Sequence, residues 1–77
     1  MATKEDKLRT LFVEHLGVDA DKVVDDAHLF DDLGGDSLDR VEIGMAIEED
    51  FNIEVTDDEM DKAETFGDWL RLIEAKA

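Results

Sequence analysis

The chain has 77 residues, enough for a single domain (residues 1–77), and it contains neither cysteine nor proline. Without cysteine it has no disulfide framework and no cysteine-based metal site, and the lack of proline favours helices over a β-rich fold. Its 23 acidic residues outnumber the 8 basic ones, and the resulting net charge of −15 disfavours nucleic acid and anionic membranes as partners and favours basic protein surfaces.

The N-terminal residues form no apolar signal region, and no apolar run approaches membrane-spanning length. We therefore expect a cytoplasmic protein without membrane insertion, and we expect it to be a monomer. Apolar residues make up 43% of the chain, which argues against disorder.

The first predicted helix covers residues 3–16. Thr3 is suited to cap its start, with Asp6 three residues later as a weak capping box, and Gly17 is suited to the left-handed conformation that ends a helix. At helical spacing one apolar stripe forms along it, made of Leu8, Leu11, Phe12, His15 and Leu16.

Residues 18–35 show no steady helical period and predict a long loop, with room for one short helical turn. Loops of this length are unusual in compact domains and are often functional. Four apolar side chains are expected to anchor it to the core: Val23, Leu29, Phe30 and Leu33.

Three more helices follow. One is predicted over residues 37–51 with Asp36 as its N-cap, and a short one begins after Thr56, whose capping box includes Glu59. The last begins after Thr65 and has an apolar stripe of its own. The predicted fold is all-α: a small four-helix bundle with a long first loop and a short third helix.

The helix over residues 37–51 has apolar side chains on two opposite sides when each residue advances the angle by about 100°. One side consists of Ile43, Ala46, Ile47 and Phe51, and the other of Leu38, Val41 and Met45, flanked by Glu42 and Glu49. We expect the first side to face the core and the second to form an exposed docking strip. The alternative is that loop residues cover the second side.

Ser37 opens this helix within the sequence Leu-Gly-Gly-Asp-Ser-Leu-Asp at residues 33–39, where the two glycines are expected to leave space for an approaching enzyme. An Asp-Ser pair alone is ordinary helix capping. A catalytic triad has no support, because Gly-x-Ser-x-Gly is absent and nothing marks His15 or His28 as a base. The calcium-binding loop pattern is also absent, and an acidic mimic of nucleic acid would not need Ser37. We predict no catalytic residue and no metal site.

The wider segment at residues 30–39, Phe-Asp-Asp-Leu-Gly-Gly-Asp-Ser-Leu-Asp, closely resembles the modification site of acyl carrier proteins. Residues 41–43, 45–51 and 53–55 resemble the recognition helix of that family and its exit. The resemblance implies a non-catalytic carrier. A phosphopantetheinyl transferase would attach 4'-phosphopantetheine from coenzyme A to the Ser37 hydroxyl, and the thiol of this arm would carry acyl groups as thioesters.

The resemblance also implies two sets of binding residues. Basic patches of acyl-processing enzymes would dock on Asp36, Leu38, Asp39, Val41, Glu42, Met45, Glu48 and Glu49. The acyl chain would be enclosed by Leu8, Phe30, Ile47, Val55, Met60, Ala63 and Trp69. The acidic character favours fatty-acid or related lipid biosynthesis. The alternative is a carrier for an amino acid or a polyketide intermediate.

Several residues depart from the pattern of fatty-acid carriers, and three of them stand out. Arg40 introduces a cation near the modification site, Gly44 removes side-chain volume inside a helix, and Trp69 replaces a small residue. Gly44 is expected to open space beside the acyl pocket, and the three together suggest a specialised member. The alternative is compensating change that conserves core volume.

Overall fold

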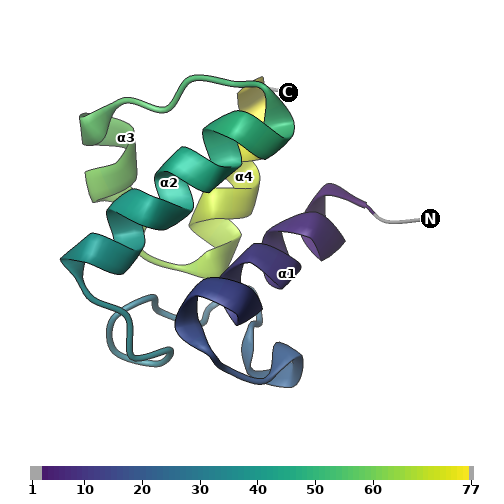
Figure 1. Cartoon of the computed structure of the whole chain (residues 1–77), viewed down its shortest axis with the longest axis vertical. Coiled ribbons are helices and arrows are strands. Elements are labelled where there is room, and N and C mark those ends of the chain that lie inside the picture. The colour runs from purple at the N-terminus through teal and green to yellow at the C-terminus, as the bar shows by residue number, and fades with distance from the viewer. Residues whose placement is uncertain (1–2, 77) are drawn as a thin grey trace.

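The computed structural model describes residues 3–76 and shows a bundle of helices around one core (Figure 1). The helices are α1 (Lys4–Leu16), α2 (Ser37–Phe51), α3 (Asp57–Lys62) and α4 (Phe66–Lys76), with a 3-10 turn, η1 (Ala20–Lys22), in the long loop. Helix α1 packs against both α2 and α4, and the short α3 packs against α2. The predicted all-α bundle is confirmed, including the short third helix. Over residues 3–76, no helix has the length and apolarity needed to cross a membrane.

Local capping sets the ends of the helices. The Thr3 hydroxyl accepts a hydrogen bond from the Asp6 backbone N–H at 3.1 Å, and Gly17 ends α1 with a φ of +66°. Thr56 and Glu59 form the same reciprocal box at the start of α3, with bonds of 2.9 and 3.1 Å. These contacts join residues three apart, which explains why the sequence alone predicts the boundaries.

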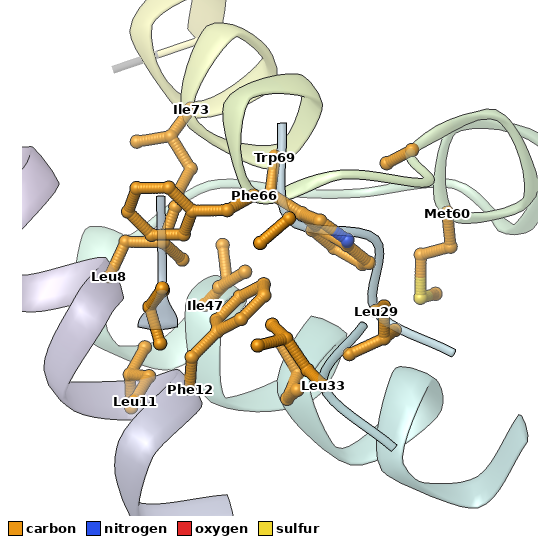
Figure 2. Packing of buried hydrophobic residues seen from close by; sticks show 14 of the residues in the cluster. Leu8, Leu11, Phe12, Leu29, Leu33, Ile47, Met60, Phe66, Trp69 and Ile73 are labelled. Carbon is orange, nitrogen blue, oxygen red and sulfur yellow. The ribbon is translucent and has the colours of Figure 1, made fainter. Parts of the chain in front are cut away.

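The core is a single cluster of apolar side chains supplied by all four helices and the long loop (Figure 2). Phe12 and Phe66 meet edge to face, with ring centroids 5.3 Å apart. Trp69 is fully buried beside them. In a chain this small, one tightly shared cluster supplies most of the stability, so each large side chain in it matters.

The long loop is pinned to the start of α4. Three backbone hydrogen bonds join the two segments: Leu29 N–H to Glu64 O at 2.9 Å, Phe66 N–H to Ala27 O at 3.0 Å and Gly67 N–H to Asp25 O at 2.8 Å. The predicted anchors Val23, Leu29 and Leu33 are buried. The segment that leads into Ser37 is therefore held by both backbone bonds and apolar contacts.

Phe30 is not an anchor, and this prediction was wrong. Its side chain is 37% exposed. The Nδ1 atom of His28 accepts hydrogen bonds from the backbone N–H groups of Phe30 and Asp31, both at 3.2 Å, and the chain there makes a tight turn at the surface. The Phe30 ring instead lies 5.9 Å from the guanidinium carbon of Arg40, a cation–π contact.

A carboxylate also holds the start of α4. Asp68 accepts hydrogen bonds from the Glu64 and Thr65 backbone N–H groups at 3.1 and 3.2 Å, and the Thr65 hydroxyl accepts one from the Asp68 N–H at 3.1 Å. Burial acts to raise the pKa of Asp68. The hydrogen bonds from Arg71 and from these backbone groups outweigh burial and hold the pKa below its usual value.

We predict that Asp68→Ala lowers the free energy of unfolding by about 1 kcal/mol at neutral pH, the usual effect of losing such a cap. Because the folded-state pKa is lowered, this contribution is present above the unfolded-state pKa and is lost as the pH falls through the folded-state value. Urea unfolding at a series of pH values measures the difference between wild type and variant. Asp68→Asn, which keeps a capping oxygen, is the control. If wild type and Asp68→Ala differ as much in free energy of unfolding in acid as at neutral pH, the prediction is contradicted.

Candidate functional site

Ser37 is the first residue of α2, and its side chain is exposed. A reciprocal capping box surrounds it: Asp36 accepts from the Asp39 backbone N–H at 2.9 Å, and Asp39 accepts from the Asp36 N–H at 3.1 Å. The predicted N-cap role of Asp36 is confirmed. Because Asp36 and Asp39 form the cap, the Ser37 hydroxyl is not needed to start the helix and is free to be modified.

The two glycines before Ser37 have different environments. Gly34 has a φ of +72° and open space around it, as expected for an approachable surface. Gly35 is packed inward: its N–H donates to Leu29 O at 2.9 Å, and a Cβ there would lie 3.1 Å from that oxygen and from the Leu16 side chain. The prediction that the glycines leave space for an approaching enzyme therefore holds for Gly34 alone. Gly35 fixes the loop against the core.

The start of α2 suits a phosphate-bearing group on Ser37. The first N–H groups of a helix lack partners within the helix, and the helix dipole favours negative charge at that end. The neighbouring carboxylates of Asp36 and Asp39 oppose a phosphate, but both accept backbone hydrogen bonds within the capping box. The site therefore offers an exposed hydroxyl at a helix end that tolerates an anion.

The outward side of α2 is an exposed apolar strip. Leu38, Val41 and Met45 are 65%, 41% and 59% exposed, whereas Ile43 and Ile47 on the opposite side are fully buried. The two predicted faces of the helix are confirmed, and the alternative that loop residues cover the strip was wrong. An uncovered strip of this kind on a small protein is typical of a docking surface.

The acidic residues predicted to surround this strip have different environments. Glu42 and Glu49 are exposed. Glu48 is half-buried, and its carboxylate accepts a hydrogen bond from the Val55 backbone N–H at 3.1 Å, which ties the end of α2 to the segment before α3. The docking role of these residues stays a prediction, and Glu42 and Glu49 are the best placed to meet a basic partner.

Six of the seven side chains predicted to enclose a cargo lie in the same core cluster: Leu8, Ile47, Val55, Met60, Ala63 and Trp69. Phe30 lies outside it, for the reason given above. Gly44 does not open an empty space, because the thioether of Met60 occupies the place where a Cβ at Gly44 would project. The expectation that Gly44 opens space beside the acyl pocket was wrong, because the Met60 side chain of α3 fills that volume. The pocket role of these residues stays a prediction.

Arg40 makes a contact that the sequence did not reveal. Its Nη2 lies 3.1 Å from Asp61 Oδ1, so the pair joins α2 to α3, and its guanidinium lies over the Phe30 ring. The Nε atom is buried and has no hydrogen-bond partner among residues 3–76. Arg40 stood out in the sequence as a departure, but nothing local indicated Asp61 or Phe30 as its neighbours.

Neither histidine forms a catalytic arrangement. His28 accepts backbone hydrogen bonds in the loop, and His15 lies 3.9 Å from Glu42 across α1 and α2. Within residues 3–76, no group of three or more His, Asp or Glu side chains is arranged to hold a metal ion.

Comparison with known proteins decides the family. Residues 6–73 match the family model described as "Phosphopantetheine attachment site". The chain belongs to this family. A solved structure, that of an acyl carrier protein from Enterococcus faecalis, superposes with a TM-score of 0.84 at 28% sequence identity, over 96% of this chain and 94% of that one. The protein is therefore a non-catalytic carrier of the acyl carrier type, and its prosthetic group is 4'-phosphopantetheine.

Proposed function

We propose that the Ser37 hydroxyl bears the phosphopantetheine arm and that the carrier presents acyl thioesters to enzymes of fatty-acid or related lipid biosynthesis. The observation that carries this proposal is the exposed hydroxyl at the start of α2, freed from capping by the Asp36–Asp39 box. When bound, the arm supplies a thiol that forms the thioester. The residues of the chain itself position the arm and present the docking strip of α2.

The attachment is tested by intact mass. Wild-type protein incubated with coenzyme A and a broad-specificity phosphopantetheinyl transferase should gain the mass of one phosphopantetheine, and peptide fragmentation should place the gain on Ser37. Protein that gains nothing, or gains it on another residue, would contradict the proposal.

The interior favours a fatty acyl cargo over an amino acid. The side chains packed behind α2 are apolar, and no polar or charged residue in the described part of the chain is buried. An aminoacyl group would bring an ammonium charge with no partner into such an interior. Arg40, Gly44 and Trp69 are the residues by which we expect this carrier to differ from a plain fatty-acid carrier.

We predict that the double reversal Glu42→Lys with Glu49→Lys lowers kcat/KM for attachment of the arm by the transferase about tenfold at low salt. The reason is that complementary charge raises encounter rates. Asp19→Lys with Glu74→Lys changes the net charge equally but lies outside α2, and this control pair should load at nearly the wild-type rate. The effect should shrink at high salt. Equal losses in the two double variants would show that net charge alone matters, against a docking role for α2.

We further propose that the carrier acts as a monomer in the cytoplasm. A net charge of −15 on 77 residues makes copies of the chain repel one another at neutral pH. Sedimentation at physiological salt should give the mass of one chain.

A further inference from the structure

The indole N–H of Trp69 is a buried donor without an acceptor. The side chain is fully buried, and Nε1 finds no hydrogen-bond partner among residues 3–76. Buried donors are almost always paired, since an unpaired one loses its bonds to water without replacement. A phenylalanine would fill most of the same space without this penalty. The N–H group of Trp69 therefore points to an acceptor that the chain itself does not provide.

The unpaired N–H lies on the side of the core nearest α3. Figure 2 shows the indole nitrogen on the side where Leu29 and Met60 lie, away from Leu8 and Ile73. Met60 belongs to the core cluster and also lines a surface cleft of about 270 Å³ between α2 and α3. The remaining lining residues of that cleft are Arg40, Val41, Asp57 and Asp61. Met60 thus has the cleft on one side and the core on the other.

The Met60 side chain separates the cleft from the core and can be displaced. Its thioether fills the notch left by Gly44, and methionine is unbranched and flexible, so it can move without shifting a backbone. The helix that carries it has six residues and is joined to its neighbours by partly exposed ion pairs, Arg40–Asp61 at 3.1 Å and Lys76–Glu59 at 3.0 Å. A chain that enters the cleft and displaces Met60 would lie along Gly44, on the side of the core that the Trp69 N–H faces.

We propose that Trp69 determines cargo specificity by donating a hydrogen bond from Nε1–H to an oxygen on the acyl chain, a hydroxyl or keto group beyond the thioester. A saturated chain of the same length would cover the indole and leave its N–H unpaired, whereas an oxygenated chain would pair it. The inference rests on the proposed function, because the cargo must be tethered to the arm to reach this position.

The test compares octanoyl cargo with hydroxyoctanoyl cargoes whose hydroxyl is placed at successive carbons, each loaded on the arm and verified by intact mass. Trp69 is the only tryptophan, so its indole N–H gives a single resonance in a ¹⁵N-labelled sample. One hydroxyl position should move that resonance downfield relative to octanoyl. The same cargo should raise the melting temperature by about 4 °C more than octanoyl does, the shift expected for one added buried hydrogen bond.

Trp69→Phe is the matched variant, because it keeps an aromatic ring and removes the donor. In this variant the hydroxylated chain should lose its advantage over the saturated one, because its oxygen no longer has a donor to pair with. If the variant does not fold, the indole resonance of the wild type decides by itself. An indole resonance that is identical for all loaded chains overturns this inference and leaves the proposed function standing. The same holds for a preference for the hydroxylated chain that persists in Trp69→Phe. A protein that never gains the arm overturns the proposed function and this inference with it.

Discussion

Ser37→Ala is expected to abolish the gain of phosphopantetheine completely while leaving the bundle folded. The loss should be total because Ser37 is the only serine in the chain, which also contains no cysteine or tyrosine. The threonine hydroxyls of Thr3, Thr56 and Thr65 accept hydrogen bonds in helix caps, and that of Thr10 donates to the Asp6 carbonyl. No second exposed, uncommitted hydroxyl remains in the described part of the chain.

The fold should survive because the helix start does not depend on Ser37. Asp36 and Asp39 supply both bonds of the capping box, and alanine has a higher helix propensity than serine, by about 0.5 kcal/mol. The melting temperature of Ser37→Ala should therefore equal or slightly exceed that of wild type. Intact mass after incubation with coenzyme A and transferase gives the first result, and thermal unfolding gives the second.

Thr10→Ala is the control for this experiment. It removes an exposed hydroxyl from α1, far along the chain from α2, and should gain the arm like wild type. A gain of mass in Ser37→Ala would show that the arm attaches elsewhere. If Ser37→Ala neither gains the arm nor folds, Ser37 has a structural role that the capping box does not explain.

The sequence predicted those parts of the structure that depend on near neighbours. The caps at Thr3, Asp36 and Thr56 involve residues three apart, and the two faces of α2 follow from the helical period. The exposure of Leu38 and Met45, the central feature of the docking strip, belongs to this class. Family resemblance then predicted Ser37, among many possible cap-adjacent residues, as the attachment site.

The parts that could not be predicted depend on contacts between distant segments. The pairing of Arg40 with Asp61 and the filling of the Gly44 notch by Met60 both require α3 to be placed against α2 first. Phe30 was expected in the core because it is apolar, but an irregular loop has no period that says which of its side chains points inward. The unpaired Trp69 N–H likewise emerges only once the core is assembled.

Gly67→Ala should be the most destabilising single-methyl change near the loop that supports Ser37. A Cβ at this position would lie 2.7 Å from the backbone oxygen of Asp25, and the Gly67 N–H donates to that same oxygen at 2.8 Å. The Asp25 carboxylate lies as close, but this side chain is exposed and can turn away. The backbone oxygen cannot, so the loop must move away from α4. The adjacent hydrogen bond from Phe66 to Ala27, at 3.0 Å, is strained by the same movement.

We expect Gly67→Ala to lower the free energy of unfolding by about 2 kcal/mol, since overpacking and a weakened hydrogen bond outweigh the gain in helix propensity. The corresponding drop in melting temperature is about 8–16 °C. Urea and thermal unfolding provide the measurement. If Gly67→Ala is as stable as wild type, the loop can move without loss of stability and is not held by the contact between Asp25 and Gly67.

Gly44→Ala is the matched control, because it adds the same methyl group to a buried glycine in a helix. There the obstacle is the flexible end of Met60, which can turn aside, and the gain of about 1 kcal/mol in helix propensity offsets the disturbance. Its stability should stay within about 1 kcal/mol of wild type. In Gly67→Ala, by contrast, the amide hydrogens of Leu29 and Gly35 should exchange faster, because the loop that they hold has lost its attachment to α4. Faster exchange in Gly67→Ala alone would show that the loop leading into Ser37 is held by a backbone contact to residue 67, thirty residues further along the chain.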